Sequence, residues 1–168
     1  NDGDPDVYLC QGNFAPNMLF VNQGNGTFTE EANLRGVDWP GDTYAASWGD
    51  YDRDGFLDLY VGNLNPLPTS TSFFAVHRLY RNDGAGSFVD VTVATGAVSM
   101  SASIGVVFHD QDQDGWPDIF CCNDRGDIGA PANALLRNQR NGTFVDIAPA
   151  IGADAPIGCM GMTVGDVD

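Results

Sequence analysis

Glutamate and basic residues are scarce in this sequence. Only Glu30 and Glu31 among the 23 acidic residues are glutamate, and lysine and arginine together number seven. The resulting net charge of −16 argues against nucleic acid or an anionic membrane as a partner, because phosphate groups would be repelled. The remaining acidic residues are aspartates, and most of them fall in a few short loops.

Long apolar segments are also missing. No apolar run reaches the roughly 18 residues that a membrane-spanning helix needs, and the first residues lack the pattern of a signal peptide. We therefore expect a mature segment, or a piece of a longer chain, without a membrane span. A length of 168 residues fits one ordinary domain with a real hydrophobic core.

Histidine occurs only twice, at His77 and His109, and neither residue is surrounded by an acid–base or nucleophile motif. We expect His77 to be a surface residue on a strand and His109 to flank a loop. The sequence therefore predicts a protein that is not an enzyme. The alternative that stays open is a catalytic domain whose active residues lie in a missing part of the chain.

Two nine-residue loops carry aspartate in the same pattern. "DYDRDGFLD" (50–58) and "DQDQDGWPD" (110–118) have aspartate at the first, third, fifth and ninth positions and glycine at the sixth. Four carboxylates so close together repel one another unless a cation lies among them. Calcium takes six to eight oxygen ligands at roughly 2.3 to 2.6 Å, which short side chains on alternate residues of a turn can supply. The pattern therefore predicts a calcium cofactor, the alternative being a solvated acidic turn.

The loops differ from an EF-hand. An EF-hand requires a bidentate glutamate at loop position 12 and flanking helices, whereas position 12 is Val61 or Cys121 here. The flanking segments "TYAASWGDY" and "LDLYVGN" are short, aromatic and β-branched, which is typical of strands. Each loop is therefore predicted to join two strands.

A second unit recurs in step with the loops. "NMLFVNQGNGTFTEEA", "HRLYRNDGAGSFVDVT" and "NALLRNQRNGTFVDIA" each read as a β-hairpin around a Gly-rich turn. A hairpin around an aspartate loop, followed by a hairpin around a Gly-rich turn, gives four strands, the number in a propeller blade. The sequence predicts an all-β fold of about three four-stranded antiparallel blades: 1–43 as repeat 1 lacking its first strand, 44–102 as repeat 2, 103–157 as repeat 3, and 158–168 as the first strand of the next or split blade.

The two ends of the chain carry the halves of a third loop. "NDGDPD" matches the second half, with Asp2 and Asp6 at ligand positions and Asp4 between them, and "GDVD" matches the first half, with Asp166 and Asp168. We expect the C-terminal pair of one copy to bind the same calcium as the N-terminal pair of the next. Two copies would close a ring of about six blades, and more would run on as a fibre. The alternatives are flanking repeats of a longer polypeptide or a truncated chain with frayed ends.

These motifs resemble the FG-GAP or VCBS calcium-binding repeats of extracellular β-propellers, in the style of the ASPIC/UnbV-associated type and more distantly of the integrin α-subunit propeller. "WGDYDRDGFLDLYVGN" and "LYRNDGAGSFVDVT" carry the resemblance, which covers nearly the whole chain. Two positions depart from it: His109 replaces the glycine found at Gly49, and Arg140 replaces a turn glycine. The ligands that the resemblance implies are Asp50, Asp52, Asp54, the Phe56 carbonyl and Asp58 in one loop, and Asp110, Asp112, Asp114, the Trp116 carbonyl and Asp118 in the other.

The resemblance implies an extracellular or cell-surface module that acts as a structural or adhesive scaffold. A carbohydrate-binding, lectin-like propeller is the alternative, because exposed aromatic rings stack on sugars. Trp39 lies in a Pro- and Gly-containing loop and is the best candidate for such contacts, although packing is the preferred role. Trp48 and Trp116, beside the aspartate loops, are expected in the core.

Asn25 and Asn141 each begin "NGT", which is a glycosylation acceptor by pattern. The alternative is that both belong to the hairpin turn, where positive φ is required.

Four cysteines, Cys10, Cys121, Cys122 and Cys159, allow three full pairings. Superposing the repeats places Cys10 on the strand after the split loop and Cys159 on the strand before it. We expect a Cys10–Cys159 disulfide across that hairpin, the alternative being four buried core residues.

Overall fold

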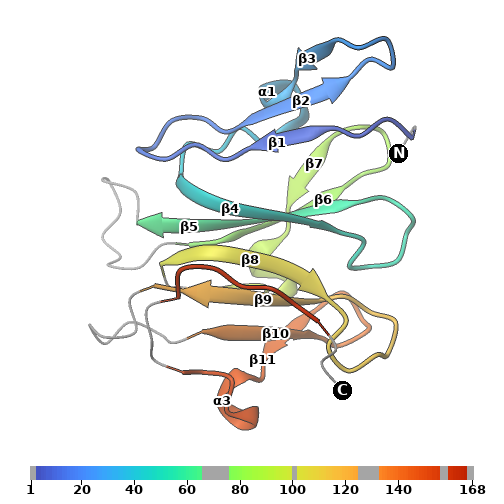
Figure 1. Cartoon of the computed structure of the whole chain (residues 1–168). Coiled ribbons are helices and arrows are strands. Elements are labelled where there is room, and N and C mark those ends of the chain that lie inside the picture. Colours follow the sequence, from blue (N-terminus) through green and yellow to red (C-terminus); the bar gives the residue numbers. More distant parts are fainter. Residues whose placement is uncertain (1–2, 66–75, 100–101, 125–132, 156–158, 166–168) are drawn as a thin grey trace.

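Three antiparallel sheets follow one another along the chain in the computed structural model, which describes residues 3–65, 76–99, 102–124, 133–155 and 159–165 (Figure 1). The first sheet consists of β1 (Val7–Leu9), β2 (Met18–Asn22) and β3 (Phe28–Glu30). The second consists of β4 (Asp42–Gly49), β5 (Asp58–Asn65), β6 (Arg78–Asn82) and β7 (Phe88–Asp90). The third consists of β8 (Ser103–His109), β9 (Asp118–Asn123), β10 (Ala134–Asn138) and β11 (Phe144–Asp146).

Each four-stranded sheet is an up-and-down unit in chain order, β4-β5-β6-β7 and β8-β9-β10-β11. The first sheet has the order β1-β2-β3, and its β1 corresponds to β5 and β9 because all three follow an aspartate loop. The predicted all-β fold of propeller-type blades is thereby confirmed. We refer to the three sheets as blades 1, 2 and 3.

The hydrophobic core lies between successive blades. One cluster, which includes Leu19, Leu59 and Tyr80, fills the space between blades 1 and 2, and another, which includes Tyr60 and Ile119, fills the space between blades 2 and 3. Neighbouring residues of a strand point to opposite faces. Strand β5 therefore contributes Leu59 to one cluster and Tyr60 to the other, and both side chains are completely buried.

A four-residue helix follows the last strand of each blade, which the sequence reading did not predict. These helices are α1 (Ala32–Arg35), α2 (Thr92–Thr95) and α3 (Ala148–Ile151). Each ends at a glycine in the left-handed conformation, Gly36, Gly96 or Gly152. A Cβ at Gly36 would lie 3.2 Å from the Phe88 carbonyl oxygen, and one at Gly96 would lie 3.1 Å from that of Phe144. Gly36 and Gly96 thus let α1 and α2 approach the outer strand of the next blade.

The predicted surface position of His77 is wrong. Its side chain is completely buried, and Nδ1 accepts a hydrogen bond from the Asn63 backbone N–H at 3.1 Å. Asn17 and Asn133 occupy the same place in the other blades, where they accept the backbone N–H groups of Gln11 and Asn123. His77 therefore has the structural role of an asparagine at the start of the turn hairpin. His109 is exposed at the end of β8, in agreement with its expected position beside a loop.

The predicted Cys10–Cys159 disulfide is also wrong, because Cys159 is bonded to Cys122, with a Cα–Cα distance of 5.6 Å. The Cys159 backbone N–H donates to the Asn123 carbonyl at 3.3 Å, so this segment lies at the end of β9. Cys10 is a free, half-buried thiol and Cys121 a free, buried one. Residues 159–165 are not a strand and run beside β8 (Figure 1), while the rest of the predicted strand, 158 and 166–168, lies outside the described residues.

Candidate metal centre

The first aspartate loop connects β4 to β5, whose last register pair is Gly49 opposite Asp58. The Asp50 carboxylate accepts the backbone N–H groups of Asp54 at 3.1 Å and Gly55 at 3.0 Å, which closes the turn. Arg53 and Gly55 have φ values of 59° and 92°. Such left-handed residues reverse the chain direction sharply, so the aspartate side chains of the loop are directed inward.

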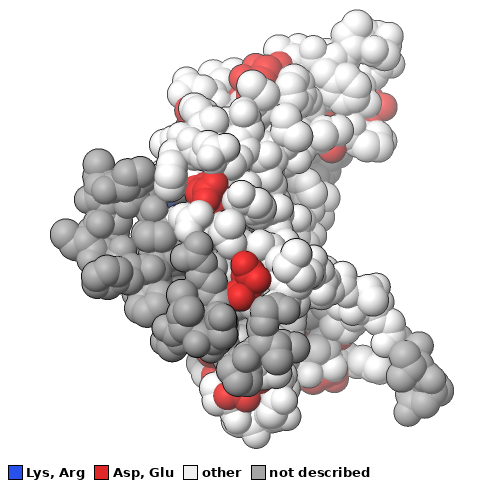
Figure 2. Space-filling view, turned by 60° about the vertical axis from the view of Figure 1, so that its left-hand side comes forward, with Lys and Arg blue, Asp and Glu red and all other residues white. Residues whose placement is uncertain are grey.

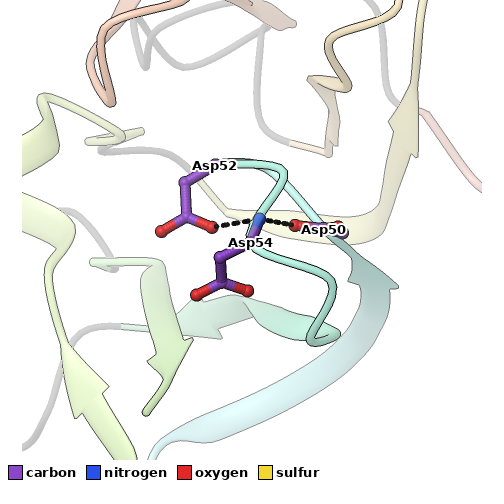
Figure 3. A group of neighbouring side chains, drawn as sticks. All are labelled: Asp50, Asp52 and Asp54. Atoms are coloured by element: carbon purple, nitrogen blue, oxygen red, sulfur yellow. Dashed lines mark hydrogen bonds between the residues drawn. The ribbon is translucent and has the colours of Figure 1, made fainter. Parts of the chain in front are cut away.

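Three carboxylates converge inside this loop (Figure 3). One oxygen from each of Asp50, Asp52 and Asp54 lies within 4.8 Å of the others. Two oxygens that bind one calcium ion at roughly 2.4 Å can be at most about 4.8 Å apart. The donor set therefore fits a hard divalent cation by its chemistry and by its spacing. Burial and the neighbouring charge of Asp54 raise the pKa of Asp52, which is the expected effect when carboxylates are crowded without a counter-ion.

The second loop connects β8 to β9 with the same backbone. The Asp110 carboxylate accepts the N–H groups of Asp114 at 3.0 Å and Gly115 at 2.7 Å, and Gln113 has a φ of 57°. The converging carboxylates here belong to Asp110, Asp112 and Asp118. Both loops lie on the same side of the molecule (right-hand side of Figure 1). The two complete loops thus each provide a cluster of three carboxylates.

The last aspartate of each loop connects the two hairpins of its blade. Asp58 Oδ1 accepts the backbone N–H of Asn82 at 2.9 Å, while Oδ2 accepts that of Tyr51 at 3.0 Å. The equivalent bonds run from Asn138 to Asp118 at 2.7 Å and from Asn22 to Asp6 at 2.8 Å. Sequence reading assigned these aspartates to metal binding alone. Their second role is to accept a hydrogen bond from the other hairpin of the blade. The asparagine that begins each Gly-rich turn, which donates this bond, was the signal for it in the sequence.

Burial dominates the electrostatics of Asp58. Its side chain is completely buried, which raises its pKa to about 7 in spite of the two N–H donors. Burial likewise raises the pKa of Asp118. A divalent cation in either loop would favour the ionised carboxylate and counteract this effect.

The remaining predicted ligands lie partly inside and partly outside the described residues, and their metal-binding roles stay predictions. Asp2, Asp166 and Asp168 lie outside the described residues, so the shared third loop stays a prediction. Asp4 is placed with its carboxylate beside the turn of the next hairpin, since a Cβ added at Gly24 would lie 2.8 Å from Asp4 Oδ2. Phe56 occupies the equivalent place, and its ring lies over Gly84. The carbonyl roles of Phe56 and Trp116 stay predictions.

The three tryptophans pack against neighbouring groups. Trp39 and Trp48 pack against the core between blades 1 and 2, and the Arg78 guanidinium lies 3.5 Å from the Trp39 ring centroid. Trp116 is half-buried beneath the guanidinium of Arg53, at 5.4 Å, and belongs to neither core cluster, so its predicted core position is wrong. Arginine thus covers one face of the Trp39 ring, which favours the packing role that the sequence predicts for this residue.

Asn25 and Asn141 are exposed and stabilise their turns. Asn25 Oδ1 accepts the backbone N–H of Thr27 at 3.0 Å, and Asn141 Oδ1 accepts that of Thr143 at 3.0 Å. Positive φ in the first of these turns falls on Gly24 and Gly26, not on Asn25. The turn role is thereby supported, while attached glycan stays a prediction.

Acidic side chains form separate patches on the face shown in Figure 2. No helix among the described residues is long and apolar enough to cross a membrane.

Repeated blades with an aspartate loop between their first two strands define a protein of the propeller-repeat class. A family model described as FG-GAP-like repeat matches residues 1–61, 75–121 and 110–168, and the chain belongs to this family.

The chain is also similar to curated proteins named cartilage acidic protein 1. It is 33% identical to the protein from Xenopus tropicalis over 83% of this chain and 20% of that protein. It is 33% identical to the Homo sapiens protein over 79% of this chain and 19% of that protein. The chain therefore spans about a fifth of the length of these relatives.

Proposed function

We propose that the chain is a non-enzymatic, calcium-stabilised module of extracellular or cell-surface type that acts as a structural or adhesive scaffold. The observation that carries this proposal is the convergence of Asp50, Asp52 and Asp54 within 4.8 Å, with a similar cluster in the next blade. Calcium in these loops would hold β4 to β5 and β8 to β9 and so stabilise the blades. The Cys122–Cys159 disulfide supports an oxidising location outside the cell.

Thermal unfolding in calcium and in a chelator tests the calcium role. A ligand that binds the folded state at 100 times its Kd stabilises it by about 2.7 kcal/mol, so the melting temperature is expected to rise by several degrees with calcium. Asp54→Ala is expected to remove part of this rise. Asp154→Ala removes the same charge outside the loops and is expected to leave the rise intact. Equal melting temperatures with calcium and chelator would contradict the proposal.

The proposal includes association through the blade ends, either with further copies, as a ring or fibre, or with flanking repeats of a longer polypeptide. Among the described residues β1 pairs only with β2, and Val7 and Leu9 on it are 49% and 47% exposed. An edge strand with exposed apolar side chains favours pairing with another strand. Gly152 has no atom within 4 Å of an added Cβ, whereas Gly36 and Gly96 contact a following blade.

The mass of the native particle distinguishes these forms of association. Light scattering in calcium is expected to give a multiple of the mass of one chain if copies associate, and the multiple is expected to fall in chelator. A monomer in both conditions would contradict self-association and favour flanking repeats as the natural neighbours.

A further inference from the structure

Arg140 forms an ion pair with one of the aspartates of the second loop. Its Nε and Nη2 atoms both lie 2.6 Å from Asp114 Oδ2. Burial alone would raise the pKa of Asp114, but the backbone N–H of Trp116 and the guanidinium of Arg140 outweigh it, so the pKa lies below its ordinary value. Asp114 is also the aspartate that does not belong to the converging cluster of Asp110, Asp112 and Asp118.

The first loop has no equivalent of this contact. Asp54 is the counterpart of Asp114, and it belongs to the converging cluster of its own loop. Arg140 occupies the turn position that is Gly84 in blade 2, where the Phe56 ring fills the space above the glycine. No ion pair to Asp54 occurs among the described residues.

Arginine is unfavourable at this turn position in its own right. Arg140 has a φ of 61°, in the left-handed region that Gly24 and Gly84 occupy at 67° and 74°. In this region the Cβ of an L residue crowds the following carbonyl oxygen, so arginine is strained there relative to glycine. The contact with Asp114 offsets part of this strain.

We infer that Arg140 acts as a built-in counter-charge that weakens calcium binding at the second loop relative to the first. This inference rests on the proposed calcium function. The guanidinium occupies Asp114 Oδ2, so that this oxygen is not open to a cation, and it offsets one negative charge beside the site. Calcium must therefore displace Arg140 or bind without Asp114 Oδ2, and the two loops fill at different calcium concentrations.

Calorimetric titration with calcium chloride tests this inference on the chain of 168 residues. The double change Asp50→Asn and Asp52→Asn first disables the first loop, so that only the second of the two complete loops contributes to the heat. Adding Arg140→Gly, which installs the residue of the other two turns, is expected to strengthen binding about fivefold, in the range of an exposed ion pair. Arg137→Gln removes an equal charge from the exposed side of β10 and is expected to change the affinity less than twofold.

The outcomes separate the inference from the proposal beneath it. Unchanged affinity after Arg140→Gly, or an equal gain with Arg137→Gln, overturns the role of Arg140 and leaves calcium binding in place. If the unmodified chain shows no heat of calcium binding and no calcium-dependent change in tryptophan emission, the calcium proposal is overturned, and the inference with it. Higher salt is expected to narrow the difference between the parent and Arg140→Gly by screening the ion pair.

Discussion

The side-chain amide of Asn138 donates a hydrogen bond of 2.8 Å to the carbonyl oxygen of Tyr51. This bond joins blade 3 to the first aspartate loop, which lies in blade 2. The backbone N–H of Asn138 also donates to Asp118, and that of Tyr51 donates to Asp58. The last aspartates of the two loops are therefore connected by three successive hydrogen bonds.

Asn138→Ala is expected to destabilise the fold by about 2 kcal/mol, because it leaves the buried Tyr51 carbonyl without its donor. Asn82→Ala is the matched control, since the Asn82 side-chain amide donates only within its own blade, to the Leu57 carbonyl at 3.2 Å. Its cost is expected to be about 1 kcal/mol smaller. Urea denaturation measures both, and equal losses would show that the bond between blades adds nothing.

The buried position of His77 predicts a stability that depends on pH. Burial lowers the pKa of His77 to about 4, against 6.5 for an exposed histidine, although the Asn123 side chain opposes this shift. Between these values the unfolded chain binds a proton that the folded chain does not, so stability is lost as the pH falls from 6.5 to about 4. The loss amounts to about 3 kcal/mol at most.

His77→Asn is the direct test, because asparagine occupies the equivalent positions 17 and 133. The free energy of unfolding is measured for both proteins at pH 7 and at pH 4.5. The parent is expected to lose more stability than the variant on acidification, whereas the contribution of the aspartates is shared by both. Parallel losses would mean that His77 does not titrate on unfolding.

Gly49 is expected to be intolerant of a side chain. A Cβ there would overlap the ring of Phe108 in the next blade, so Gly49→Ala is expected to cost about 2 kcal/mol. Gly161→Ala is the control, since no atom lies within 4 Å of its added Cβ. His109 occupies the equivalent position in blade 3. It is exposed, so its side chain meets no such restriction. A melting temperature unchanged by Gly49→Ala would contradict this packing.

The disulfide pattern predicts a specific set of peptides. Digestion without reduction is expected to release Cys122 linked to Cys159, and alkylation of the folded protein is expected to label Cys10 before the buried Cys121. Burial raises the pKa of the Cys10 thiol to about 11, so its alkylation is expected to be slow at pH 8. A peptide that links Cys10 to Cys159 would contradict the structure.

Local patterns were readable from the sequence, whereas contacts between blades were not. The aspartate loops and Gly-rich turns depend on residues a few positions apart, so the strands around Asp50 and Asp110 could be predicted with their candidate ligands. The burial of His77, the pairing of Cys159 and the contact of Arg140 with Asp114 depend on which residue of another segment lies opposite. The short helices were missed because the preceding strands could be read as continuing through them.

Strand β5 belongs to two cores at once, with Leu59 facing blade 1 and Tyr60 facing blade 3. When an outer blade opens, only one face of β5 loses its cover, and the other neighbour still holds it in place. In repeat architectures stability is approximately a sum over repeats and the interfaces between them. In a molecule of these 168 residues, local opening is therefore expected to begin at blades 1 and 3. The amide protons of β5 are expected to exchange with solvent only on global unfolding, so their exchange rates would measure the stability of all three blades together.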